Sequence, residues 1–196
     1  MKSDFVEEEL FIKIFPYMTM ENALAVSTSL QTGMRIGDVV SLKRSNINKK
    51  GNVISFTAQK TGKKAEISIS RELCDRLCRN SGKKYVFEGK NVNKHRTRQA
   101  VWVDVKKACE KVGITENLTP HSARKNYAVN LLRKTGSLSD VQRALQHSNA
   151  DVTKLYAYAD RKSFVIDDEV REELKNLFRE VLLDLLPCCR CSKNQP

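Results

Sequence analysis

The sequence predicts an α+β fold that is mainly helical, with one small antiparallel β-sheet in its N-terminal third. The chain has 196 residues, 40% of them hydrophobic, which is enough for the core of one domain or at most two small ones. Apolar residues recur mostly at intervals of three and four, as in helices, and only residues 52–70 change to an alternating period. We therefore expect one helical domain into which a β-hairpin is inserted early.

The first part of the chain is divided by strong helix-ending signals. Helices are expected over residues 4–15, 18–31 and 36–43. Pro16 ends the first of them and Gly33 the second, and residues 46–51 are interpreted as a turn. In residues 52–70 two alternating runs flank the sequence KTGKK, which predicts a hairpin with a basic tip.

Helical spacing returns after the hairpin. Further helices are expected over residues 70–79, 98–112, 122–134, 138–146 and 151–158. The intervening segment 81–98 is polar and basic, except for a short YVF run that is compatible with an extra strand. Residues 170–186 carry apolar side chains at a 3.6-residue period and predict an amphipathic helix that ends at Pro187.

The positive charge is concentrated in the middle of the chain. The net charge is +12, and residues 43–134 alone hold 23 Lys and Arg against 7 Asp and Glu, a net of +16. A basic segment between near-neutral flanks is typical of a surface that faces phosphates, although a solvated lysine-rich exterior would have the same composition. A polyanionic partner is therefore expected.

Several other classes of protein are disfavoured. No apolar run approaches the roughly 18 residues that span a bilayer, and the N-terminus is acidic where a signal peptide is basic, so a soluble cytoplasmic protein is expected. The cysteines have no zinc-like spacing and are expected to be free thiols, three in the folded part and three in the tail. They are Cys74, Cys78, Cys109, Cys188, Cys189 and Cys191.

Four segments carry residues suited to phosphate chemistry, and the first two lie in the N-terminal half. In TGMRIGDVVSL, Gly33 permits a turn, and Asp38 follows Arg35 by three residues, so its carboxylate can hold the guanidinium in place. In QKTGKK, Lys60 lies on the hairpin turn, from which a lysine can reach into a DNA groove. Lys63 and Lys64 are competing candidates.

The third segment, LTPHSARKNYAVNLL, has a more specific pattern. Pro120 opens a helix that puts His121 and Arg124 on one face. That face offers a single phosphate both a planar cation and an imidazole that exchanges protons near neutral pH.

The fourth segment is LQHSNADVTKLYAYAD. A single helix would put His147 and Tyr156 on opposite faces, so the chain must break between them, and Ser148 with Asp151 is a candidate capping box for the new helix. Tyr158 is the alternative to Tyr156.

In this order the four segments resemble the catalytic domain of the tyrosine recombinase (phage integrase) family, over roughly residues 20–160. The resemblance implies that family's fold and six catalytic residues: Arg35, Lys60, His121, Arg124, His147 and Tyr156. The two arginines would hold the scissile phosphate with help from the histidines, Tyr156 would be the nucleophile, and Lys60 would be the general acid. His121 would be the base for the phenol. No metal, ATP or other cofactor is implied.

Two positions depart from the family pattern. Gln146 stands where a glycine usually precedes the second histidine, and Lys125 stands where a histidine usually follows the second arginine. Neither position belongs to the six catalytic residues, so a change in local packing is expected rather than a loss of chemistry.

The resemblance also implies a domain layout and partners. Residues 1–165 would be the catalytic domain, residues 166–187 a helix that packs in cis or is exchanged between protomers, and residues 188–196 a flexible tail. The family's N-terminal DNA-binding domain would be absent, which suggests a truncated chain or a minimal recombinase. Such a protein would bind double-stranded DNA weakly and with strong salt dependence, as a monomer in solution and a tetramer on DNA.

The expected activity is site-specific DNA cleavage and rejoining through a 3′-phosphotyrosyl intermediate. Three alternatives stay open at this point. The chain could be a regulator that keeps the fold without cutting DNA, a topoisomerase-like enzyme that nicks and reseals one strand, or an unrelated basic helical protein.

Overall fold

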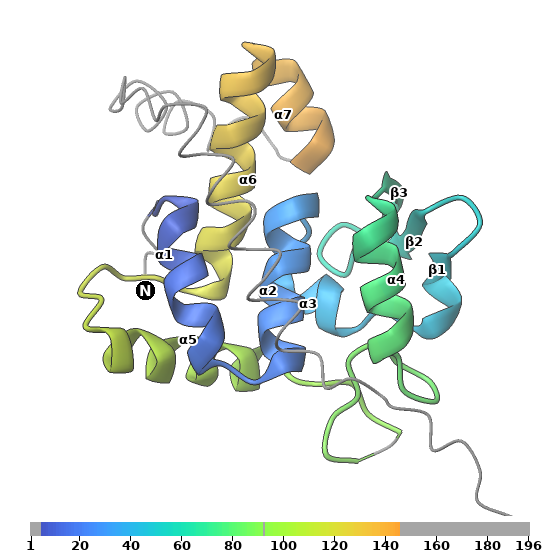
Figure 1. Cartoon of the computed structure of the whole chain (residues 1–196). Coiled ribbons are helices and arrows are strands. Elements are labelled where there is room, and N and C mark those ends of the chain that lie inside the picture. The colour runs from blue at the N-terminus through green and yellow to red at the C-terminus, as the bar shows by residue number, and fades with distance from the viewer. Residues whose placement is uncertain (1–4, 92, 146–196) are drawn as a thin grey trace, which may run out of the picture. The chain divides into compact units, whose positions relative to one another are not determined.

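The computed structural model describes residues 5–91 and 93–145. Along the chain, helices come before and after a small sheet (Figure 1). The helices are α1 (Glu8–Ile14), α2 (Met20–Thr32), α3 (Ile36–Val40), α4 (Arg71–Asn80), α5 (Arg98–Val112), α6 (Pro120–Thr135) and α7 (Leu138–Leu145). Two 3-10 turns, η1 (Phe15–Tyr17) and η2 (Arg44–Asn46), join them. The mainly helical α+β class is confirmed, and α5 has the bounds that its spacing predicts. The helices expected at 151–158 and 170–186 lie outside the described residues.

The sheet has the antiparallel order β1–β2–β3, formed by β1 (Ile47–Asn48), β2 (Val53–Thr57) and β3 (Lys64–Ser68). β2 and β3 are the predicted hairpin, with the buried Ile54 opposite Ile67. The prediction of a turn over residues 46–51 is wrong at its start, where Ile47 pairs with Ile54 as a third strand. Two residues are too few to display an alternating period, so the strand leaves no sequence signal.

The YVF run does not become a strand of this sheet. Tyr85 forms only an isolated bridge with Lys43, and the N–H of Val86 donates to the carbonyl of Leu42 at 2.9 Å. The next residue, Phe87, is fully buried. Residues 85–87 therefore attach the basic segment 81–98 to the chain that follows α3.

Helix α2 is the centre of the core. It is buried on nearly every side and packs against α6, α5 and α3. Its buried hydroxyls are satisfied locally, as when Thr28 donates to the carbonyl of Leu24 at 2.7 Å. At its N-terminus, Asp104 of α5 accepts from the backbone N–H of Thr19 at 2.9 Å and from Asn22 at 2.7 Å. These contacts fix the helix whose C-terminal end supports the candidate site.

The first helix begins later than predicted, at Glu8 rather than residue 4, and the chain before it is tied to α6. The carbonyl of Val6 accepts from Asn126 at 3.1 Å, and Glu7 pairs with Arg133 at 3.3 Å. Pro16 does not simply end the helix, because it lies inside the 3-10 turn η1.

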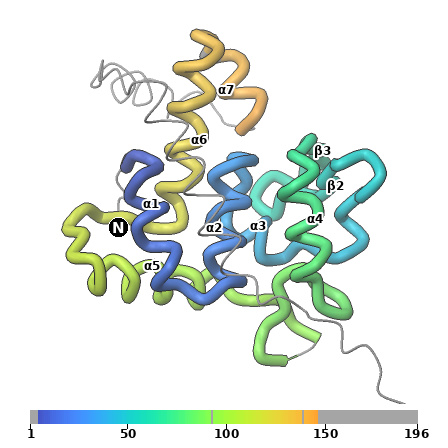
Figure 2. Tube along the Cα trace, in the orientation of Figure 1, coloured from blue at the N-terminus to red at the C-terminus, as the bar shows by residue number. Residues whose placement is uncertain are grey.

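Helix α7 folds back onto α6 after Gly136, which has a φ of 64° (Figure 2). Its buried side chains, Val141 and Leu145, pack into a cluster with Ala128, Val129 and Leu132 of α6. This packing sets the position of Leu145, the last described residue.

The three cysteines of the described region are free thiols, as predicted. Burial is the main cause that raises the thiol pKa of both Cys74 and Cys109. Cys188, Cys189 and Cys191 lie outside the described residues. Within the described residues, no helix combines the length and apolarity that a bilayer crossing needs.

Candidate phosphate-binding site

The candidate site is built on the turn between α2 and α3. Gly33 caps α2 with a φ of 68°, and a Cβ atom there would lie 2.5 Å from Cδ1 of Tyr127. Both the backbone conformation and the space therefore require glycine. Two residues later, the half-buried Arg35 is the N-cap of α3. The turn thus brings Arg35 to the surface of α6.

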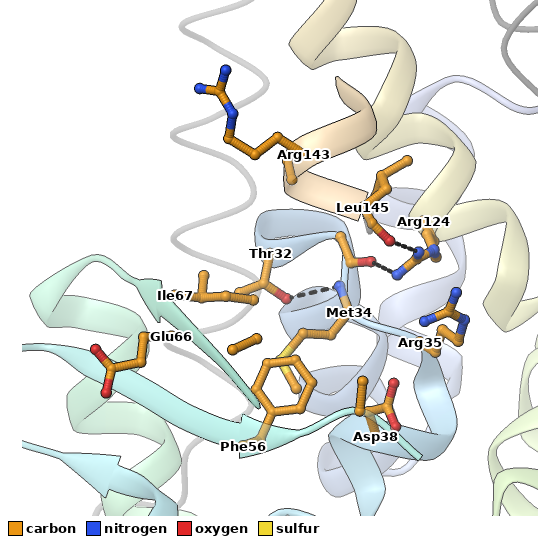
Figure 3. Close-up of a pocket in the computed structure, with 14 residues that line it drawn as sticks. Thr32, Met34, Arg35, Asp38, Phe56, Glu66, Ile67, Arg124, Arg143 and Leu145 are labelled. Atoms are coloured by element: carbon orange, nitrogen blue, oxygen red, sulfur yellow. Dashed lines mark hydrogen bonds between the residues drawn. The ribbon is translucent and has the colours of Figure 1, made fainter. Parts of the chain in front are cut away.

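Arg124 of α6 holds three segments together. It is 5% exposed, and it donates from Nη1 to the carbonyl of Gly33 at 2.5 Å and from Nη2 to the carbonyl of Leu145 at 2.6 Å (Figure 3). Within the described residues its buried Nε–H has no hydrogen-bond acceptor. A planar guanidinium is suited to this task because its donors diverge in fixed directions.

The charge on Arg124 is placed in an unfavourable environment. Burial, and after it the charge of Arg35, lower the pKa of Arg124 to about 10, while Asp38 acts in the opposite direction. The side chain is still a cation at neutral pH. A buried cation beside a second arginine favours the binding of an anion, which would offset the desolvation.

The two arginines line a hollow of about 190 Å³. One wall is the apolar side of the hairpin, formed by Phe56 and Ile67 among others, and another is the end of α7 with Arg143. Figure 3 shows Arg35 and Arg124 on the same side of this hollow. The arrangement suits a phosphate group that carries an apolar neighbour, as a nucleotide does.

Asp38 has a different contact from the predicted one. Its carboxylate is 4% exposed, and Oδ1 accepts from the backbone N–H of Gln59 at 2.9 Å instead of forming an ion pair with Arg35. The expectation that Asp38 holds the Arg35 guanidinium is therefore wrong. Spacing within a helix cannot reveal a partner that lies 21 residues away on another element.

The contact at Gln59 anchors the loop that carries Lys60. The carbonyl of Ala58 accepts from the N–H of Thr61 at 3.3 Å and of Gly62 at 2.8 Å, and Gly62 has a φ of 66°. Lys60 is exposed at the apex of this tight loop. Its side chain does not line the hollow.

His121 is the second residue of α6, after Pro120, in the position that the sequence predicts. The helix starts with a capping box in which Thr119 and Ser122 satisfy each other's backbone N–H groups. His121 is exposed, one turn before Arg124. Lys125, at one of the departures from the family pattern, is half-buried.

The structure thus brings Arg35 and Arg124 together, puts His121 on the same helix as Arg124, and places Lys60 on an anchored loop. His147 and Tyr156 lie outside the described residues, as do Tyr158 and Gln146. Leu145, whose carbonyl Arg124 holds, comes two positions before His147. Two residues of the site escape sequence reasoning, Asp38 in its true role and Arg143. The sequence signal for Arg143 is its place four residues before His147.

The sequence matches a known family. The family model described as the phage integrase family matches residues 5–163. The tyrosine recombinase XerD of Lacticaseibacillus casei is 30% identical over 146 residues, which cover 68% of this chain and 49% of that protein. The tyrosine recombinase XerA of Pyrococcus furiosus is 26% identical over 186 residues, or 90% of this chain and 64% of that protein. The chain therefore spans about half to two thirds of the length of these relatives.

Solved structures share the fold. A crystal structure of XerA recombinase superposes with a TM-score of 0.64 at 21% identity, over 90% of this chain and 64% of that one. The catalytic domain of bacteriophage HP1 integrase gives a TM-score of 0.61 at 20% identity, over 87% of this chain and 95% of that one. A lambda integrase dimer bound to a COC′ core site gives 0.65 at 21% identity, over 85% and 51%.

Proposed function

Because this chain belongs to the phage integrase family, we propose that it is a site-specific DNA recombinase that cuts and rejoins strands through a 3′-phosphotyrosyl intermediate. The observation that carries the proposal is the pairing of Arg35 with the buried Arg124 at one hollow. A phosphodiester resists attack because negative charge builds on its non-bridging oxygens. Two arginines fixed by the fold supply the positive charge at that place.

The proposed step uses the six residues that the sequence predicts. The hydroxyl of Tyr156 attacks the phosphorus and gives up its proton to His121, while Arg35, Arg124 and His147 hold the phosphate oxygens. The bond from phosphorus to the 5′ oxygen breaks, and Lys60 protonates that oxygen. The result is a 3′-phosphotyrosine and a free 5′ hydroxyl.

Rejoining is the same step in reverse. A 5′ hydroxyl from another strand attacks the phosphotyrosine, Lys60 takes up its proton, and Tyr156 leaves and regains a proton from His121. Because the covalent link conserves the energy of the phosphodiester, the proposal includes no ATP. The arginines provide the charge that a metal ion would otherwise supply, so the proposal includes no metal either.

Double-stranded DNA is the proposed substrate and partner. The +16 segment, residues 43–134, exposes many of its basic side chains, among them Lys43, Lys60, Lys63 and Lys83. Contacts of this kind bind the phosphate backbone with little sequence choice and are weakened by salt. We further propose that the chain is monomeric in solution and tetrameric on DNA, with residues 166–187 exchanged between protomers.

Covalent trapping tests the enzyme proposal. A nicked DNA site lets the short cleaved product diffuse away, so the phosphotyrosyl adduct accumulates and shifts on a denaturing gel. Wild-type protein should form this adduct in EDTA without ATP. Tyr156→Phe should bind the same DNA and form none, whereas the matched control Tyr158→Phe should form it at the normal level.

Each other outcome contradicts part of the proposal. An adduct with Tyr156→Phe but none with Tyr158→Phe would move the nucleophile to Tyr158. DNA binding by wild type without any adduct on its recognised site would favour a regulator that does not cut. Relaxation of a supercoiled plasmid without strand exchange would favour a topoisomerase-like activity. The mass of the complex on DNA, with and without residues 165–196, tests the exchange.

A further inference from the structure

Helix α7 turns one face to the core and the other to the hollow. Val141 and Leu145 are buried against α6, whereas Arg143 and Ala144 are exposed and line the hollow. Arg143 is therefore held at the rim of the hollow by packing on the far side of its own helix.

The backbone near Arg143 is fixed by Arg124, the buried arginine of the site. Arg124 donates to the carbonyl of Leu145 at 2.6 Å, two residues beyond Arg143. Figure 3 shows the Arg143 side chain leaving α7 in the direction away from Arg124 and Arg35. It is therefore placed to meet a different group from the one that those two arginines face.

The charge of Arg143 is available at little cost. Its side chain is 80% exposed, and Nη1 lies 3.4 Å from Oδ1 of Asp140, itself 41% exposed. An exposed ion pair of this kind contributes little free energy, so a phosphate can replace the carboxylate as partner. On the opposite wall of the hollow, β3 presents Glu66, which repels phosphate. The two walls together favour a phosphate on the α7 side.

We propose that Arg143 binds the DNA backbone phosphate next to the one that Arg35 and Arg124 hold. The inference rests on the proposed function and adds a contact to it. Successive phosphates of one strand rise about 3.4 Å along the helix axis and also turn around it, so the neighbouring phosphate needs a cation outside the pair that holds the first. Arg143 is then a binding residue that sets the direction in which the strand leaves the site.

The salt dependence of DNA binding tests this contact. Fluorescence anisotropy with a labelled duplex of arbitrary sequence is measured over a KCl series, because a backbone contact needs no particular sequence. Arg143→Gln should lower the slope of log K against log salt by about 0.9 and weaken binding about tenfold at low salt. Arg143→Lys should keep most of the slope. The matched control is Lys13→Gln, which removes one exposed charge from the last turn of α1, outside the +16 segment.

The outcomes separate this contact from the recombinase proposal. An unchanged slope for Arg143→Gln, or an equal fall for Lys13→Gln, would overturn the assignment of Arg143. The covalent adduct that the wild-type protein forms reports on the recombinase proposal instead. Wild-type protein that forms no adduct would overturn the recombinase proposal even if the slope falls as expected.

Discussion

Replacing Asp38 with alanine should release the loop that carries Lys60 and slow DNA cleavage, although Asp38 is far from Lys60 in the sequence. The Asp38 carboxylate is buried and accepts from the N–H of Gln59 at 2.9 Å. Lys60 is the next residue, at the apex of the loop. Without the anchor, Lys60 would spend less time near the 5′ oxygen that it is proposed to protonate.

The cost in stability can be estimated from the contacts. A hydrogen bond to a charged group contributes about 1.5–3 kcal/mol, and the low end applies because Gln59 is exposed and water can replace the carboxylate. Asp38 also partly offsets the charge of Arg124. We expect a total loss of about 2–3 kcal/mol and a fall in Tm of about 4–12 °C. Asp38→Asn keeps an acceptor oxygen and should lose about half as much.

A substrate with a different leaving group distinguishes an effect on the Lys60 loop from an effect on the two arginines. Sulfur in place of the bridging 5′ oxygen gives a thiolate leaving group, which needs no proton because thiols are far more acidic than alcohols. Asp38→Ala and Lys60→Ala should both be slow on the oxygen substrate and recover on the sulfur substrate. Arg35→Ala should stay slow on both. If Asp38→Ala is equally slow on both substrates, the reasoning fails, and Asp38 acts through the arginines.

Substitutions at two further positions of the site, Gly33 and Arg124, test its core. Gly33→Ala should lower the free energy of unfolding, measured by chemical denaturation, by about 2–4 kcal/mol, because it combines a left-handed backbone with overlap on Tyr127. The control Gly136→Ala also has a positive φ but meets open space, and it should lower that free energy by about 1–2 kcal/mol. Equal losses would contradict the packing argument. Arg124→Lys keeps the charge but cannot reach the carbonyls of both Gly33 and Leu145, so thermal unfolding should show a loss of about 2–4 kcal/mol and trapping assays should show no adduct. A normal Tm for this variant would show that the two carbonyl contacts contribute little.

Periodicity predicts the parts of the fold that are set by local burial. The bounds of α5 and the hairpin of β2 and β3 follow from the spacing of apolar residues, and Gly33 marks the end of α2. The short strand β1 and the late start of α1 do not follow, because pairing with β2 and contacts with α6 decide them. These are interactions between distant segments, which no local pattern encodes.

The sequence alone determined the family resemblance, the basic middle segment and the order of the candidate residues, because residue type and spacing are enough to specify each of them. Only the tertiary structure decided which residues contact one another. In it, Asp38 accepts a hydrogen bond from the hairpin backbone instead of pairing with Arg35, and Arg124 joins the α2–α3 turn to the end of α7. Arg143 lies at the rim of the hollow. The physical reason is that burial and hydrogen-bond geometry are satisfied between elements, so a buried carboxylate or guanidinium takes the backbone partner that packing brings within reach.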